Sequence, residues 1–160
     1  MKDITIEATL TVFETINELP DDVAALMQKA IDVRTHAYAP YSKFYVGAAL
    51  LLDNGKVITG NNQENASYPS GLCAERTAIY YAGSQFPNAK IVRMALSAGS
   101  QKEGTDVPIP PCGACRQAIA EYEVKQEQPI DIYFMGTTGK VVRSKSLANL
   151  LPLGFDRSFL

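Results

Sequence analysis

The chain has 160 residues, which fits one domain with a buried core, and 46% of them are hydrophobic against 20% charged. The net charge of -2 gives no sign of the basic surface that nucleic-acid binding needs, and no apolar run approaches the roughly 20 residues that cross a membrane. The N-terminal decapeptide alternates polar and apolar residues and has no signal-peptide core. We therefore expect a cytoplasmic protein that binds neither nucleic acid nor membrane.

The N-terminal segment has the period-2 pattern of a half-buried strand over residues 4–12, because Ile4, Ile6 and Leu10 share one parity and threonines the other. We expect this arm to be an edge strand or an oligomer contact. It divides the chain into an N-terminal extension, residues 1–20, and one domain, residues 21–160.

The first helix is expected to begin at Asp21 and Asp22, which offer an N-cap, and to run to about Ala37, because the following Ala39-Pro40 pair disfavours helix. The only histidine, His36, falls near its C-terminal end. A cation is favoured there by the helix dipole, so a structural role for His36 is preferred over metal ligation.

The rest of the chain alternates strand and helix patterns, which predicts an α/β fold with a mixed sheet covered by helices. Only five residues, 136–140, separate the last two strands, and a link that short joins antiparallel neighbours. The expected elements are strands over 44–52 and 57–60 joined by an Asn-Gly turn, a helix from about 71–73 to 82, a strand over 90–98, a surface loop over 100–111, a helix over 113–122, strands over 130–135 and 141–143, and a short helix over 147–151.

All three cysteines lie in two short motifs, Cys73-Ala74-Glu75 and the Pro111–Cys115 segment PCGAC. An odd number of cysteines in a reducing compartment favours metal or redox chemistry over disulfides. Each motif falls at a predicted helix start, where free N–H groups and the dipole stabilise thiolates. Three protein ligands leave a fourth position for water, as in catalytic zinc sites.

The residues beside Cys73 complete this hypothesis. Glu75 is poorly placed to bind the same ion but could accept a proton over the open position. Arg76 lies on the helix face of Cys73 and could offset the excess negative charge of three thiolates, and Arg116 is a second candidate for that role.

Three simpler interpretations of the cysteines remain open at this point. They could form a thioredoxin-like redox pair, although this needs neither the third cysteine nor the glutamate. They could hold structural zinc, although a fourth ligand is then missing unless distant His36 or a carboxylate supplies it. They could also pack as small hydrophobic residues.

Longer stretches around these motifs resemble the small homotetrameric cytidine deaminases, in order and spacing across residues 23–155. The C-A-E and P-C-G-A-C pattern is itself similar to the zinc-deaminase signature. The resemblance implies hydrolysis of cytidine and 2′-deoxycytidine to the uridines in pyrimidine salvage, and a three-layer α/β/α fold with a five-stranded mixed sheet. The stretches are AYAPYSKFYVGAAL at 37–50, GNNQENASYPSGLCAERTA at 60–78, PCGACRQ at 111–117 and LLPLGF at 150–155.

The resemblance also implies a role for individual residues in a homotetramer with one Zn²⁺ per subunit. It places Cys73, Cys112 and Cys115 on the zinc and makes Glu75 the proton shuttle. It implies that the nucleoside is bound by Phe44 on the pyrimidine, Asn62 and Glu64 on the ribose hydroxyls, and the Ala74 N–H on the base. Contributions from neighbouring subunits are implied for Ala66, Tyr68, Gly71, Leu72 and Phe155.

Departures from the family pattern are confined to the first 20 or so residues and the 99–110 loop. Three rival functions stay open: deamination of another nucleoside or base such as blasticidin S, nucleic-acid editing, and a zinc-stabilised binding module without catalysis. The acidic balance speaks against editing. An open coordination position beside a free glutamate speaks against a purely structural zinc.

Overall fold

A computed structural model describes residues 1–100 and 104–160. Its centre is a six-stranded mixed sheet in the order β1-β6-β5-β4-β2-β3, in which only β4 and β5 are parallel. The strands are β1 Thr11–Phe13, β2 Phe44–Leu52, β3 Val57–Asn61, β4 Ile91–Ser100, β5 Asp131–Met135 and β6 Val141–Ser144; the helices are α1 Asp21–Arg34, α2 Ala74–Gln85 and α3 Gly113–Gln126.

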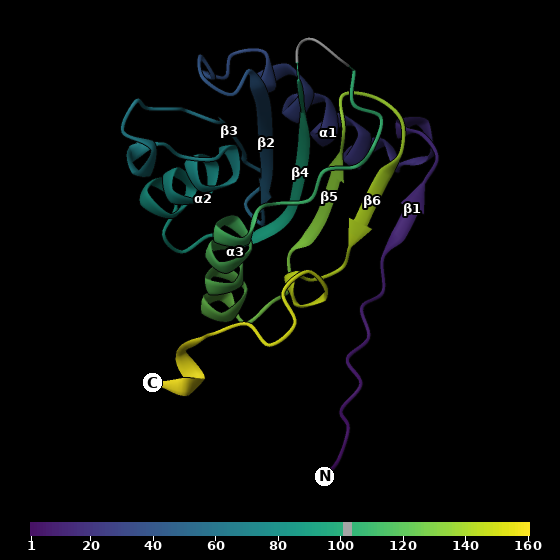
Figure 1. The fold of residues 1–160 in the computed structure, drawn as a ribbon, viewed down its shortest axis with the longest axis vertical. Coiled ribbons are helices and arrows are strands. Elements are labelled where there is room, and N and C mark those ends of the chain that lie inside the picture. The colour runs from purple at the N-terminus through teal and green to yellow at the C-terminus, as the bar shows by residue number, and fades with distance from the viewer. Residues whose placement is uncertain (101–103) are drawn as a thin grey trace.

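Helices cover both faces of this sheet, as Figure 1 shows, with α1 on one face and α2 and α3 on the other. Each face has its own hydrophobic cluster, one around Met27 and Ala49 under α1, the other around Ile79 and Leu96 under α2 and α3. The predicted α/β/α class and the antiparallel last pair are confirmed. The predicted number of five strands is one short, because β1 adds a strand beside β6.

Two glycines allow the helices to lie close to the sheet. A Cβ on Gly47 of β2 would fall 2.0 Å from the Ala30 carbonyl oxygen of α1. A Cβ on Gly60 of β3 would fall 2.7 Å from the Ala74 carbonyl oxygen of α2. Both contacts are far too short for a side chain, so glycine is required at each. The second contact places the start of α2, where the functional motif lies, directly over the sheet.

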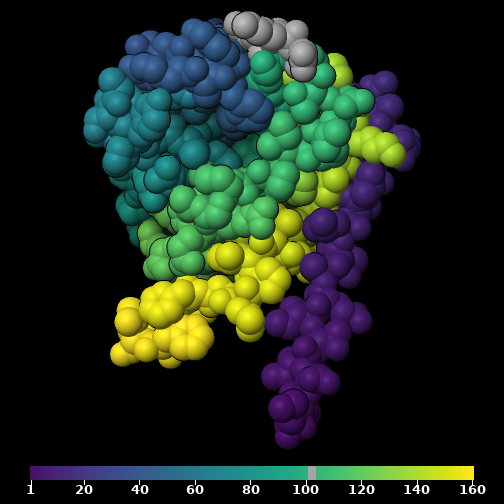
Figure 2. All heavy atoms as spheres, viewed as in Figure 1, coloured from purple at the N-terminus to yellow at the C-terminus, as the bar shows by residue number. Residues whose placement is uncertain are grey.

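The predicted strand over 4–12 is wrong in extent. Only Thr11–Phe13 pair with β6, and residues 1–10 continue as an exposed arm with no regular structure. Figure 2 shows this arm leaving the body of the molecule. The cause is the length of the partner: β6 has four residues, so alternation along the arm has no further strand to pair with.

The first helix begins at Asp21, as predicted, but it is shorter than predicted. Its N-cap is Pro20 in place of the expected aspartates, and Asp22 forms an ion pair at 2.6 Å with Arg93 of β4. It ends at Arg34, because Thr35 donates its hydroxyl to the Asp32 carbonyl and the chain tightens into turns. His36 lies in these turns, exposed to solvent and outside the group of possible metal ligands found among the described residues.

The other elements follow the predictions closely. The strand over 44–52 and the Asn-Gly turn, with Gly55 at a φ of 79°, are confirmed. Helices α2 and α3 run three and four residues further than expected, to Gln85 and Gln126. Gly83 lies within α2 and does not end it. The Tyr122 side chain of α3 packs against this glycine.

The last predicted elements are also present, with small differences. The short helix over 147–151 is a 3₁₀ turn, Leu147–Asn149. Strand β4 runs to Ser100, two residues further than predicted, and so includes the first positions of the predicted 100–111 loop and of the divergent 99–110 segment. Residues 101–103 lie outside the described residues, and residues 104–111 are irregular. Within the described residues, no helix combines the length and apolar character that a membrane span requires.

Candidate active site

The starts of α2 and α3 bring the three cysteines together. Cys73 is the N-cap of α2, Cys112 is the N-cap of α3, and Cys115 lies one turn into α3. The Sγ atoms of Cys73 and Cys112 are 3.9 Å apart and those of Cys112 and Cys115 are 3.5 Å apart. All three sulfur atoms lie within 4.8 Å of one another. Residues about forty positions apart in sequence therefore form one compact ligand group.

This group fits zinc. With Zn–S bonds of about 2.3 Å, two sulfur ligands of a tetrahedral site lie about 3.8 Å apart. The two sulfur–sulfur distances given above, 3.5 and 3.9 Å, lie on either side of that value. Since the three thiols come from two rigid helix starts, they supply a preformed, three-ligand set. Among the described residues they are also the one group of histidine, cysteine or acidic side chains found with such spacing.

The cysteines already share their protons unequally. The neighbouring Cys115 thiol, together with Arg76 and Cys112, lowers the pKa of Cys73 to about 5 against the cost of burial. The same interaction and burial raise the pKa of Cys115. One thiolate is thus ready at neutral pH, and a cation that binds all three sulfurs must displace the remaining protons.

Arg76 provides the positive charge that the sequence predicted. Its Nη2 lies 3.8 Å from the Cys73 sulfur. Its Nε atom is buried and has no hydrogen-bond partner among the described residues, so the guanidinium retains a donor for a second sulfur. The alternative of Arg116 is wrong: that side chain donates to the carbonyl oxygens of Pro111 and Leu150, both at 2.8 Å.

Glu75 lies beside the cysteines and is only 5% exposed. Burial raises the pKa of its carboxyl group, and the negative charge of Cys73 acts in the same direction. A buried carboxyl group whose pKa is raised toward neutrality can both accept and release a proton at physiological pH. The position and environment of Glu75 therefore suit proton transfer.

A pocket of about 460 Å³ opens at this site. Of the three cysteines only Cys73 lines it, together with the segment between β3 and α2 and the turn before β2, and Glu75 is not among its lining residues. Its walls include seven residues that sequence reasoning had singled out: Asn62, Glu64, Tyr68, Gly71, Leu72, Cys73 and Arg76. Tyr41, Ser42, Gln63 and Asn65 complete the wall. The volume is sufficient for a small molecule of nucleoside size.

The side chains of Asn62 and Glu64 hold the neighbouring turn. Asn62 accepts from the Val46 N–H at 2.8 Å and donates to the Phe44 carbonyl at 2.9 Å. Glu64 accepts from the N–H groups of Tyr41 and Ser42 and from the Ser42 hydroxyl, which holds the pKa of Glu64 below its ordinary value. Both residues thus shape the pocket wall in addition to facing it.

Phe44 and Ala74 are also near this wall, as predicted, but neither contributes to the pocket lining. Phe44 is half-buried at the first position of β2, and Ala74 is fully buried at the first position of α2. Sequence reasoning missed Ser42, whose role became visible only through its contacts. Its signal was a short polar residue between Pro40-Tyr41 and the start of a strand.

Four of the five positions expected to serve neighbouring subunits are exposed, and the fifth, Gly71, is half-buried. Tyr68 is 76% exposed, Phe155 57% and Leu72 37%, and Ala66 is also exposed. Tyr68, Gly71 and Leu72 lie at this chain's own pocket, whereas Phe155 lies in the C-terminal tail, where Gln117 of α3 donates to its carbonyl. The structure does not bring Phe155 together with the pocket-lining residues.

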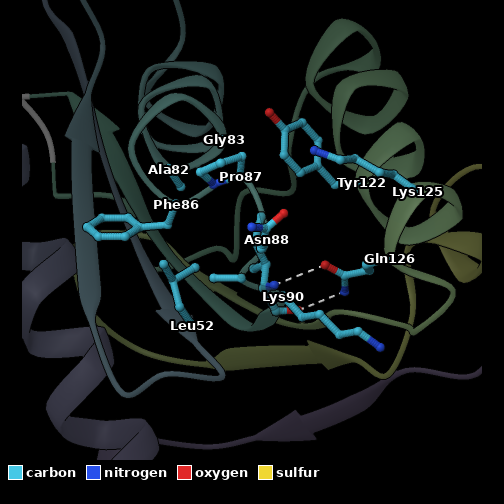
Figure 3. Close-up of a pocket in the computed structure, with 12 residues that line it drawn as sticks. Leu52, Ala82, Gly83, Phe86, Pro87, Asn88, Lys90, Tyr122, Lys125 and Gln126 are labelled. Carbon is cyan, nitrogen blue, oxygen red and sulfur yellow. Dashed lines mark hydrogen bonds between the residues drawn. The ribbon is translucent and has the colours of Figure 1, made fainter.

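A second hollow, drawn in Figure 3, lies between α2 and α3 near the start of β4. Its volume is about 70 Å³, and none of its lining residues is a cysteine or a carboxylate. Figure 3 shows Gln126 with both ends of its amide hydrogen-bonded to the backbone of Ile91. The Gln126 amide therefore holds helix α3 against the sheet and does not point to a ligand.

The model of the family described as "cytidine and deoxycytidylate deaminase zinc-binding region" matches residues 20–128, which contain all three cysteines, Glu75 and Arg76. The chain belongs to the cytidine and deoxycytidylate deaminase family. A cytidine deaminase from Halalkalibacterium halodurans is 42% identical over 135 residues, which is 84% of this chain and 94% of the relative. One from Mycobacterium tuberculosis is 36% identical over 86% of this chain and 92% of the relative.

Solved structures of this family have the same fold. The cytidine deaminase from Burkholderia pseudomallei matches with a TM-score of 0.70 at 38% identity, over 82% of this chain and 97% of that one. The enzyme from Mycobacterium tuberculosis matches with a TM-score of 0.65 at 32% identity, over 86% and 99%. The family is a zinc-binding one, and the Cys73, Cys112 and Cys115 group is where this chain can hold the ion.

Proposed function

We propose that this protein deaminates cytidine and 2′-deoxycytidine by hydrolysis, giving the uridines and ammonia, in pyrimidine salvage. The observation that carries this proposal is that a pocket lined by Cys73, Asn62 and Glu64 opens beside the three-sulfur metal group and the buried Glu75. Family membership and the relatives named cytidine deaminase support the same reaction.

Cys73, Cys112 and Cys115 would hold one zinc ion per subunit. Zinc supplies Lewis-acid chemistry to such a site, since it lowers the pKa of water to about 7. Three thiolates reduce this effect, and Arg76 counters the reduction by drawing electron density from the Cys73 sulfur.

Glu75 performs the proton transfers in this proposal. It removes a proton from the attacking water and delivers it to N3 of the pyrimidine as the new C–O bond forms at C4. It then takes the remaining proton from the new C4 hydroxyl and delivers it to the amino group, as the C4 carbonyl forms, the C4–N bond breaks and ammonia leaves. The raised pKa of Glu75 suits both directions of transfer. No electrons are exchanged, and water supplies every atom that the product gains.

Substrate orientation is assigned to the wall of the pocket. Glu64 and Asn62 face the sugar, the Ala74 N–H at the start of α2 faces the base, and Phe44 lies beside the pyrimidine ring. A site whose polar groups are desolvated on binding rejects a ligand that leaves them unpaired. A bare base such as cytosine should therefore be a poor substrate.

We also propose that the protein works as a homotetramer. The support is the exposure of Tyr68, Leu72 and Phe155, large apolar side chains for which a single chain offers little cover. Neighbouring copies would bring Ala66, Tyr68, Gly71, Leu72 and Phe155 to each other's sites. Residues 1–20 would remain an extension of the catalytic domain, residues 21–160.

A direct assay tests the function. The zinc-loaded protein is incubated separately with cytidine, 2′-deoxycytidine, cytosine, adenosine and blasticidin S, and ammonia release and ultraviolet absorbance are followed. Turnover of the first two alone supports the proposal. Turnover of blasticidin S alone would assign a different substrate, and no turnover with full zinc occupancy would favour a non-catalytic zinc module.

A further inference from the structure

Ser42 occupies a central position in the pocket wall, in the turn that leads into β2. Its hydroxyl donates to Oε1 of Glu64 and accepts the N–H of Phe44 at 3.0 Å. Because one hydroxyl can donate and accept at the same time, Ser42 connects the Glu64 carboxylate with the backbone of Phe44. Both Ser42 and Glu64 line the 460 Å³ pocket.

The turn leaves Glu64 with little unused acceptor capacity. Oε2 accepts the N–H groups of Tyr41 at 2.9 Å and Ser42 at 3.3 Å, and Oε1 accepts the Ser42 hydroxyl. A carboxylate has about four lone-pair sites, so about one remains, and it is on Oε1. Glu64 is thereby prepared to accept a single additional hydrogen bond from a molecule in the pocket.

The backbone around Ser42 depends on these bonds. Lys43 has a φ of 54°, in the left-handed region that a residue with a side chain rarely adopts. On the far side of this residue, Asn62 binds the Phe44 carbonyl and the Val46 N–H. The turn is therefore held from Glu64 through the Ser42 hydroxyl and from Asn62 through its amide.

We propose that Ser42 is a positioning residue for recognition of the sugar. It orients Oε1 of Glu64 toward one sugar hydroxyl and, through the Phe44 N–H, keeps the entry of β2 in register with that carboxylate. The proposal rests on the proposed nucleoside deaminase function. It predicts that the contribution of Ser42 depends on the substrate bearing a hydroxyl for Glu64.

The experiment compares Ser42→Ala with wild type on cytidine and on 2′,3′-dideoxycytidine, which lacks both ring hydroxyls. For cytidine we expect KM to rise about tenfold and kcat to change less than about threefold, since the loss is mainly in binding. For dideoxycytidine KM should change less than about twofold. Ser42→Thr, which keeps the hydroxyl, should restore the cytidine KM. Ser84→Ala, at an exposed position of α2, is the matched serine control.

A double variant separates action through Glu64 from a general structural role. In a Glu64→Ala background, Ser42→Ala should add almost nothing to the loss for cytidine. Equal KM increases for both substrates, or additive losses in the double variant, would overturn the proposal. If Ser42→Ala does not fold, Glu64→Ala is compared with wild type on the same two substrates. Equal increases of KM for cytidine and dideoxycytidine would then contradict recognition of the sugar by Glu64 and overturn the proposal.

Failure of the underlying function is distinguishable. It would appear as wild-type protein, fully loaded with zinc, that turns over neither nucleoside.

Discussion

The metal end of the pocket and its sugar end are built in different ways. At the metal end, Cys115 is fully buried and Glu75 nearly so, and both lie in the first turns of helices packed on the sheet. At the end where we propose that the sugar binds, Glu64 lies on irregular chain between β3 and α2 and is held by hydrogen bonds to the turn before β2, while Tyr68 lies in a 3₁₀ turn and its ring contacts Tyr41. Helix packing on the sheet thus fixes the cysteines and Glu75, while contacts between loops form the opposite wall of the pocket.

This contrast predicts different consequences for substitutions. Changes at the metal end should lower activity toward every substrate alike. Changes at the sugar end should alter KM in a manner that depends on the sugar.

Cys115→Ser should abolish zinc binding and reduce activity below detection, because a serine hydroxyl is a poor zinc ligand compared with a thiolate. Metal content by atomic absorption and turnover of cytidine check this. A chelator should inactivate the wild type as well, and added zinc should restore the wild type but not the variant. Full zinc occupancy in the variant would contradict the assigned ligand set.

Glu75→Gln should retain zinc and lose about 10³-fold or more in kcat, since amide replaces the group that transfers the proton. The loss should be similar for cytidine and 2′-deoxycytidine. Near-normal turnover by a zinc-loaded variant would refute the role given to Glu75.

Arg76→Gln should lower kcat by about tenfold, because the charge opposing the thiolates is lost while all three ligands remain. The pH dependence of kcat should move to higher pH, as a more negative metal site acidifies water less. Zinc content and pH–rate profiles of variant and wild type measure both effects. An unchanged profile would count against charge compensation by this residue.

Glu64→Gln should lower the Tm by an amount that is constant from about pH 5.5 to about pH 8, because the carboxylate is ionised throughout that range. The pKa of Glu64 in the folded protein is below its ordinary value, chiefly because the Ser42 hydroxyl binds the ionised form. Its contribution is therefore fully present above the ordinary carboxyl pKa of about 4.3 and is lost as pH falls through the lower folded value. Thermal unfolding across pH tests this, and a difference that varies near neutrality would contradict it.

Deletion of residues 1–10 should have the smallest effect, with kcat/KM within about twofold of wild type, because none of these residues lines the pocket. Size-exclusion chromatography with light scattering would show whether assembly is retained. A loss of assembly would establish the arm as an oligomer contact, which is the alternative that the sequence pattern left open.

Much of this architecture could be predicted because local patterns and tertiary demands agree. The strand Phe44–Leu52 is apolar throughout and ends in an Asn-Gly turn, and both signals act locally. The prediction for the arm was wrong in extent for the opposite reason. Its residues alternate between polar and apolar as clearly as in any strand, but a strand forms only beside a partner, and β6 is only four residues long. Arg116 failed similarly, because adjacency to Cys115 does not determine which carbonyl oxygens a long side chain reaches.

The sequence alone predicted a chemistry for this protein: the cysteine spacing, the glutamate two residues after the first cysteine and the arginine after that indicate metal ligands, a base and a counter-charge. Such roles depend on residue type and short-range helical geometry, which are readable along a chain. Only the tertiary structure decided how Ser42, Asn62 and Glu64 share one turn, because those hydrogen bonds join segments whose separation in sequence says nothing about their distance in space.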